Sequence, residues 1–232
     1  SAAGNINLRN NRDSRLQGVQ AQNLTLNSKG DITAPGVMQV GGLTTLTADG
    51  EITLANDNNH LNELEIRQAE NVTVHAGHWL NLTQVFSSGD VYTRTEGLKL
   101  SDRLEANSFR FDAGGSTAVL DGLLNVDTLA GRAQGIVVQH GISVDSIELN
   151  SQGGTMELDA DLETRQGLDL RGMNIEQNAA LLSGGMLRVS SDANYRQRAK
   201  VTAETDVWVS AGHDITMESG ALSHTRSGEI RY

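Results

Sequence analysis

The sequence predicts an all-β fold, a right-handed parallel β-helix with about 20 residues in each coil. Three observations lead to this prediction. Short phrases of alternating apolar and polar residues run through the chain, Gly, Asn and Asp separate them, and similar phrases recur at a regular interval. The 232 residues include 25 glycines and a single proline, so the turns depend on Gly, Asn and Asp.

The pattern is clearest in residues 41–76, GGLTTLTADGEITLANDNNHLNELEIRQAENVTVHA. In the phrase EITL, alternation directs Ile52 and Leu54 to one face of a strand and the polar residues to the other. The pair Asp49-Gly50 before it suits a tight turn, because Gly adopts a positive φ without steric cost. Strand, glycine turn, strand, asparagine-rich corner and strand together make one coil.

The same pattern predicts each further strand, since a Gly, Asn or other small polar residue precedes or follows a short segment of alternating apolar and polar residues. In chain order the expected strands are residues 5–8, 23–28, 31–33, 43–48, 51–54, 64–66, 72–74, 89–91, 97–100, 109–111, 115–120, 147–149, 154–158, 167–170, 185–189 and 207–209.

Two kinds of corner are expected between these strands. Asn56, Asn58 and Asn59 can bond backbone groups that the sheet leaves unpaired, so we interpret them as structural residues and not as catalytic ones. Pro35-Gly36 fits the central positions of a type II turn, in which Gly supplies the positive φ.

The alternative to a solenoid is an antiparallel sandwich, which also has many short strands. The interval between the strands distinguishes the two folds. Equivalent strand starts fall about 20 residues apart, a period that a sandwich does not require. These starts are Leu24, Thr44 and Leu64, and then Ile147, Leu168, Leu187 and Val207. We therefore expect a single β-helical segment over residues 1–232, with an irregular stretch around residues 83–145, where no register can be assigned.

Composition excludes several classes of function. The formal net charge of -11 argues against nucleic-acid binding, which needs a basic face. Without cysteine, disulfides and thiolate metal sites cannot form. No apolar run is long enough to span a membrane and no signal peptide is present, so membrane insertion is not expected. Aromatic residues make up only 3%, which suits a narrow core of aliphatic side chains.

A carbohydrate-active β-helix enzyme is the alternative function, and it would need two carboxylates facing each other across a groove. Asp159, Asp161 and Glu163 share a strand face by alternation, and Asp145 and Glu148 lie one coil away. We interpret these residues as a solvated acidic face. We therefore expect no enzymatic activity and assign no catalytic residue.

Metal and cofactor sites are not predicted either. His75 and His78 are the only histidines close together, a turn at Gly77 separates them, and no third ligand follows at a fixed spacing. Phosphate-binding glycine loops and nucleophile motifs are absent from the sequence.

One stretch is a candidate partner-binding site. Residues 190–200, SSDANYRQRAK, interrupt the alternating pattern between the strands at Leu187 and Val207. They place Arg196, Arg198 and Lys200 close to Tyr195 in an otherwise acidic chain. Arg and Tyr are favoured at recognition surfaces. The hypothesis is contact with an anionic surface group such as an acidic glycan, and the alternative is a strand face whose charges are only solvated.

The phrases AQNLTLNSKGDIT, GGLTTLTADGEITLANDNNHLNELEI and AGHDITMESGA resemble the repeats of filamentous-haemagglutinin-like large exoproteins of Gram-negative two-partner secretion. The resemblance is strong over residues 4–82 and 187–221 and diffuse between them. These secreted proteins include adhesins and the stalks of contact-dependent inhibition toxins. The asparagine-proline signature of the family's amino-terminal secretion domain is missing here, so the chain resembles an internal stalk segment.

The resemblance implies an extended β-helix, export through an outer-membrane transporter partner, and a place outside the cell or on its surface. It also implies a structural or adhesive role in virulence, through attachment to a receptor or glycan on a host or neighbouring cell. Because a fold does not determine a function, these expectations rest on analogy.

Overall fold

The computed structural model describes residues 4–232, and they form two compact units that divide after Gly115. The described residues contain strands and turns but no helix. Each unit is a parallel β-solenoid with about 20 residues in a coil, so the predicted fold class is confirmed. The right-handed sense of the coil stays a prediction.

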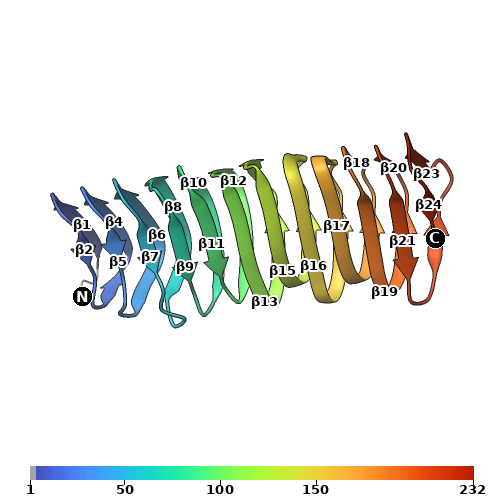
Figure 1. Cartoon of the computed structure of the whole chain (residues 1–232). Coiled ribbons are helices and arrows are strands. Elements are labelled where there is room, and N and C mark those ends of the chain that lie inside the picture. Colours follow the sequence, from blue (N-terminus) through green and yellow to red (C-terminus); the bar gives the residue numbers. More distant parts are fainter. Residues whose placement is uncertain (1–3) are drawn as a thin grey trace. The chain divides into compact units, whose positions relative to one another are not determined.

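The strands of the first unit follow one another from coil to coil (Figure 1). They are β1 (Asn5–Asn10), β2 (Ser14–Arg15), β3 (Val19–Ala21), β4 (Asn23–Ser28), β5 (Ile32–Thr33), β6 (Met38–Ala48), β7 (Ile52–Leu54), β8 (His60–Gln68), β9 (Val72–His75), β10 (Trp79–Phe86), β11 (Asp90–Arg94) and β12 (Gly97–Glu105). The boundary between the units lies within β13 (Ser108–Leu120).

The second unit is built in the same way. Its strands are β14 (Leu123–Asn125), β15 (Thr128–Val138), β16 (Ile142–Leu158), β17 (Leu162–Gln177), β18 (Leu181–Ser183), β19 (Leu187–Gln197), β20 (Lys200–Ala203), β21 (Val207–Ala211), β22 (Ile215–Met217), β23 (Leu222–Thr225) and β24 (Ile230–Arg231).

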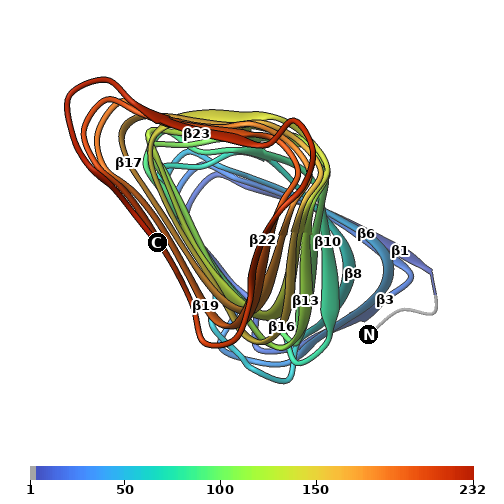
Figure 2. The same ribbon diagram turned by 90° about the vertical axis from the view of Figure 1, so that its right-hand side faces the viewer.

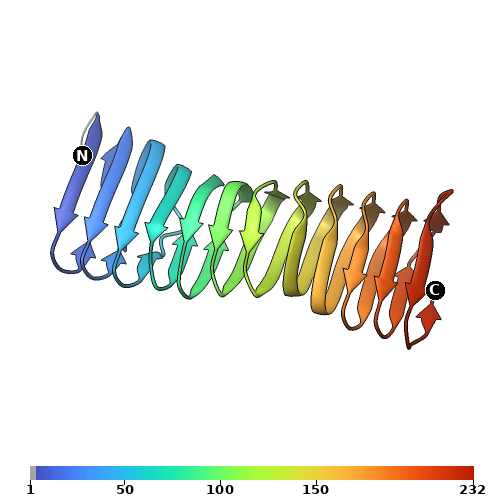
Figure 3. The same ribbon diagram turned by 90° about the horizontal axis from the view of Figure 1, so that it is seen from above.

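Strand pairing in the first unit gives each coil three sides, as Figure 2 shows. One wall contains β1, β4 and the second half of β6, and another contains β2, β5, β7 and β9. The third wall joins β3 to the beginnings of β6 and β8. All these pairs are parallel, and within each wall of a unit the strands of Figure 3 point the same way. Each coil therefore bonds only to the coils before and after it.

The predicted register is confirmed in both units. In the first unit Leu24 pairs with Thr44, and Thr44 pairs with Leu64. In the second unit the pairs follow the predicted starts one by one, as Ile147 with Leu168, Leu168 with Leu187, and Leu187 with Val207. Within each unit, the recurring strand starts of the sequence are thus stacked on one another from coil to coil.

The stretch 83–145, where we expected irregularity, also contains paired strands. Its register was hard to follow because the coils there are shorter: Leu64 pairs with Leu82 and Leu82 with Leu100, an offset of 18 residues each time. A bulge between Leu82 and Gln84 shifts the register further within β10. Between Leu64 and Leu100 the offset between paired residues thus differs from the 20 residues found between Leu24 and Thr44.

The core of each unit lies inside its coils and consists mainly of aliphatic side chains. Side chains in several coils have at most 2% of their surface exposed to water, as in Leu24, Leu64, Leu100, Leu168 and Leu187. Such stacks remove apolar surface from water, which contributes about 1.5–3 kcal/mol for each fully buried side chain. The low aromatic content of the sequence fits this narrow interior.

In the asparagine-rich corner before β8, Asn56 and Asn59 have the structural role that we predicted. Asn59 is fully buried; its Oδ1 accepts the N–H of Met38 at 2.8 Å, and its Nδ2 donates to the carbonyl oxygen of His75 at 3.0 Å. Asn56 donates from its amide to the carbonyl oxygen of Pro35 at 3.0 Å. These two side chains therefore satisfy backbone groups of neighbouring coils.

The type II turn predicted at Pro35-Gly36 is wrong. The positive φ predicted for Gly50 in its tight turn is wrong as well. Among the described residues only Gly220 has a positive φ. A Cβ on Gly36 would lie 1.5 Å from the carbonyl oxygen of Gln17 in the preceding coil. Glycine is needed here because the backbones of two coils approach closely, and not because of the φ angle.

Candidate functional site

Most of the candidate partner-binding stretch belongs to a regular strand and is not an interruption. β19 runs from Leu187 to Gln197, and its side chains alternate between the core and the surface along its whole length. It pairs with β17 on one side and with β21 and β22 on the other. The alternation places Arg196 on the surface and Tyr195 in the core.

Tyr195 is therefore excluded as a contact residue, which corrects the sequence prediction. Its side chain has no exposed surface, and its hydroxyl donates to Oε1 of Gln177 at 3.1 Å. It stacks between Ile175 and Ile215 in the ladder. Burial raises the pKa of the Tyr195 phenol well above its ordinary value, so the hydroxyl keeps its proton.

The two arginines of the stretch do reach the surface, but carboxylates of adjacent coils neutralise them. Arg196 Nε lies 2.5 Å from Oε1 of Glu218. Arg198 bridges Glu176 and Glu218, at 2.8 Å and 3.2 Å. Lys200 begins β20 and is exposed. This cluster of Arg196, Arg198, Lys200, Glu176 and Glu218, here called the arginine cluster, carries a formal charge of only +1.

The ionisation of Glu218 follows from this arrangement. Desolvation raises the pKa of the Glu218 carboxyl, but the hydrogen bond from Arg196 and the charges of Arg196 and Arg198 outweigh it. The pKa therefore lies below its ordinary value. The ion pairs join β17, β19 and the corner after β22, so the arginine cluster links successive coils.

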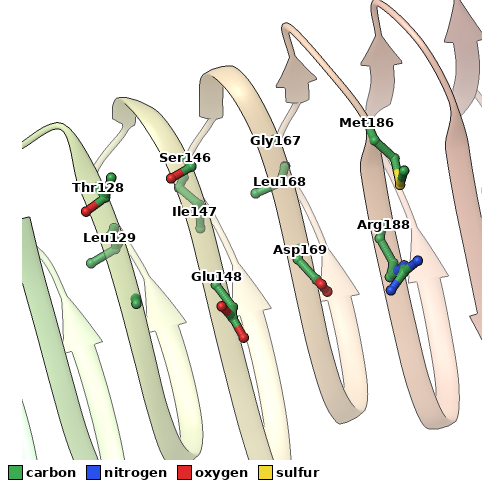
Figure 4. Close-up of a pocket in the computed structure, with 11 residues that line it drawn as sticks. Thr128, Leu129, Ser146, Ile147, Glu148, Gly167, Leu168, Asp169, Met186 and Arg188 are labelled. Atoms are coloured by element: carbon green, nitrogen blue, oxygen red, sulfur yellow. The ribbon is translucent and has the colours of Figure 1, made fainter.

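The sequence did not indicate a shallow groove on the surface of the second unit, which Figure 4 shows. Its volume is about 410 Å³. Small residues, Thr128, Ala130, Ser146 and Gly167, leave the space free. Beside them, Glu148, Asp169 and Arg188 stand on successive coils, in register with Ala130.

The charged side of the groove contains one fixed carboxylate. Arg171 binds Asp169 through two hydrogen bonds, at 3.1 Å and 2.7 Å. This hydrogen bonding, together with the charge of Asp169, raises the pKa of Arg171. Both carboxylate oxygens of Asp169 are thus bound by one guanidinium.

An aromatic residue continues the same outward row beyond the groove. Arg188 pairs in register with Trp208, and Trp208 with Arg231. Each guanidinium carbon lies 5.3 Å from the centre of the indole ring, which is cation–π distance. Arginines of both adjacent coils thus lie against the Trp208 ring, of which 37% stays exposed.

The acidic residues singled out in the sequence do not lie on one strand. Asp159 and Asp161 lie in the corner between β16 and β17, where Asp159 accepts the Asn178 amide at 2.6 Å. Asp161 accepts the N–H of Ala180 at 2.8 Å. Glu163 is on β17, and Asp145 is paired with Arg165. Their observed contacts are those of corner and surface residues.

The histidines are arranged differently from the expectation. His75 Nδ1 lies 3.1 Å from Oδ1 of Asp57, whereas the ring of His78 packs on that of His60. Among residues 4–232 there is no group of three or more His, Asp or Glu side chains that could hold a metal ion. Within the same residues no helix is long and apolar enough to cross a membrane.

Fold and surface together define a class, the parallel β-solenoids built of stacked coils. A family model described as repeats of unknown function (DUF5649) matches residues 3–64, which fall in the first unit. The chain is similar to that repeat family over this part of its length. No match was found among curated proteins or among solved structures.

Proposed function

We propose that the chain is a structural and adhesive β-solenoid segment of a large secreted surface exoprotein. The observation that carries this proposal is the continuous parallel register of each unit, in which every coil bonds to its neighbours and turns rows of polar side chains outward. Stacked coils of this kind build length one coil at a time, which suits a stalk.

The resemblance to filamentous-haemagglutinin-like repeats supports the rest of the proposal. We infer export through an outer-membrane transporter partner, a location outside the cell, and attachment to a receptor or glycan of a host or neighbouring cell. The parent protein is an adhesin or the stalk of a contact-dependent inhibition toxin. Repeats that match the family of unknown function over residues 3–64 fit a segment of this kind.

Location tests the proposal most directly. Antibodies raised against the purified segment should label intact cells of the source organism, and protease added outside the cells should remove the label. Labelling that requires permeabilised cells would overturn the proposal. A periplasmic and a cytoplasmic protein serve as controls for leakage.

Adhesion through the arginine cluster is a separate part of the proposal. An anionic surface group would have to compete with Glu176 and Glu218 for Arg196 and Arg198. Replacing both arginines with Gln should then weaken binding of the purified protein to cells, and more so at low salt, where charge attraction is less screened.

The matched control for this variant is the double change Arg165→Gln and Arg171→Gln. These two arginines are also exposed and paired with aspartates, but they lie on β17 outside the arginine cluster. If both double variants bind as the unaltered protein does at low and at physiological salt, the arginine cluster has no adhesive role. Equal loss in the two variants would also contradict that role.

A further inference from the structure

Two imidazoles lie against each other on the surface of the first unit. The ring centroids of His60 and His78 are 3.4 Å apart, and their planes are inclined by 37°. His60 begins β8 and His78 immediately precedes β10, so the rings come from neighbouring coils. Both side chains are exposed.

Hydrogen bonds fix the backbone in front of each histidine. Asn59, which precedes His60, is held by its buried side chain, and its carbonyl oxygen accepts the N–H of Gly77 at 3.1 Å. Gly77 precedes His78, and a Cβ at this position would lie 2.5 Å from the carbonyl oxygen of Asp57. The close approach that glycine permits therefore brings the two imidazoles together.

The ring nitrogens of this pair are available for a ligand. Within residues 4–232, neither imidazole forms a hydrogen bond or an ion pair with another residue. His75, only three positions before His78, differs in this respect, since its Nδ1 lies 3.1 Å from Asp57 and 3.2 Å from Arg94.

We propose that His60 and His78 form a binding site for a divalent transition-metal ion, Cu²⁺, Ni²⁺ or Zn²⁺. Imidazole is a preferred ligand of these ions. Each metal–nitrogen bond is about 2.0–2.1 Å long, so two such ligands of one ion lie roughly 3 Å apart. The centroids of the two rings lie 3.4 Å apart, which is close to this spacing.

The surroundings add a further ligand of the right kind. Gln39 is the register partner of His60 on the preceding coil, and both line a surface hollow of about 480 Å³. Its amide oxygen and water molecules can complete the coordination of an ion bound to two imidazoles. Cu²⁺ should bind most tightly, because it heads the affinity order for nitrogen ligands among divalent first-row ions.

Calorimetric titration of Cu²⁺ into the folded chain, prepared without a histidine tag, tests this inference. We expect one high-affinity ion per chain, with an electron paramagnetic resonance spectrum that shows imidazole nitrogen ligation. His60→Gln and His78→Gln should each weaken this binding at least about tenfold, since either change leaves a single imidazole. Both positions are exposed, so the melting temperature without metal should stay unchanged.

His140→Gln is the matched control, because His140 is an exposed histidine of the second unit. It should leave Cu²⁺ binding unaltered, and Mg²⁺, which prefers oxygen ligands, should not compete. Wild-type affinity in both His60→Gln and His78→Gln would overturn the inference, and so would an equal loss in His140→Gln. These outcomes are independent of the proposed function, which the location experiment tests.

Discussion

At the scale of single residues, the corner glycines show how closely the coils approach one another. Gly36 has an ordinary φ, but there is no room for a side chain between its Cα and the preceding coil. A sequence identifies such a residue as a turn former without revealing why it must be Gly. The reason is a contact with Gln17, which becomes visible only when the coils are stacked.

Replacing Gly36 with Ala should therefore destabilise the protein by about 1–3 kcal/mol, as overpacking of a close contact does. Gly18→Ala is the matched control, because a Cβ there would meet the carbonyl oxygen of Val37 at 3.5 Å, an ordinary van der Waals distance. Urea unfolding of both variants measures the difference. A midpoint for Gly36→Ala equal to that of Gly18→Ala would contradict the steric explanation.

A second prediction concerns a polar atom within the apolar ladder. Thr44 is completely buried between Leu24 and Leu64, and its hydroxyl has no hydrogen-bond partner. Thr44→Val removes this desolvated hydroxyl and should stabilise the protein by about 1 kcal/mol.

For the neighbouring Thr45, the same substitution should change the free energy of unfolding in the opposite direction. Thr45 Oγ1 donates to Oε2 of Glu65 at 3.0 Å, so Thr45→Val loses a hydrogen bond to a charged group and should destabilise by about 1–2 kcal/mol. Denaturant unfolding of both variants under the same conditions gives the two values. Equal signs for the two changes would show that the Thr44 hydroxyl has a partner in solution.

At the scale of elements, several strands with apolar inward residues were predictable, but β15 and β20, whose inward residues include Ile136 and Val201, were not. The ladder of Ile147, Leu168, Leu187 and Val207 was read correctly because every inward position is aliphatic. In β19 the inward positions after Val189 include Ser191 and Gln197, and the outward positions are also polar. Where the inward and the outward residues of a strand are both polar, the sequence shows no alternation of hydrophobicity. The continuous strand β19 was therefore interpreted as an interruption.

The same strand explains why the candidate site was only partly predictable. Counting by twos from Val189 would have placed Tyr195 inside, where it bonds Gln177. The pairing of Arg196 and Arg198 with Glu218 depends on residues one coil away, which no local pattern shows. The His60–His78 contact was missed for the same reason, since it requires an 18-residue coil in place of the expected 20.

The ion pairs of Glu218 make the attachment of β22 depend on pH. Because the folded pKa of Glu218 lies below its ordinary value of 4.5, its stabilising contribution is present above that value and is lost as the pH falls through the folded pKa. At pH 7, Glu218→Gln should therefore increase hydrogen exchange of the β22 amides. At pH 3 the variant and the unaltered protein should differ less.

Glu163→Gln is the control for this experiment, because Glu163 is exposed and belongs to no ion pair within the described residues. It should leave exchange in β22 unaltered at both pH values. A difference between Glu218→Gln and the unaltered protein that grows towards pH 3 would contradict the assigned sign.

At the scale of the whole molecule, the fold class followed from the period of the sequence, but the division into two compact units did not. The period is visible because each coil must place apolar side chains above those of its neighbour. The pair Gly114-Gly115 lies at the division, but Gly41-Gly42 and Gly184-Gly185 lie within a single unit, so a glycine pair does not mark the division in the sequence.

The stacking of the coils also determines how far the effect of a destabilising substitution should extend through a unit. Ile52 is completely buried and pairs with Ile32 and Val72 on the adjacent coils. Ile52→Asp places an unpaired carboxylate between these rungs and should destabilise the first unit by at least about 3 kcal/mol. In a solenoid each coil is stabilised mainly by its neighbours, so the loss should be greatest near the substitution.

Hydrogen exchange measured by mass spectrometry tests this pattern. Amides of β5, β7 and β9 should lose the most protection, and those of β12, several coils away, should lose less. Thr53→Asp is the matched control, because the neighbouring Thr53 lies on the opposite face of β7 and is partly exposed. An unchanged melting temperature for Ile52→Asp would contradict the inward position of Ile52. Uniform loss of protection in all coils of the unit would instead contradict nearest-neighbour stabilisation.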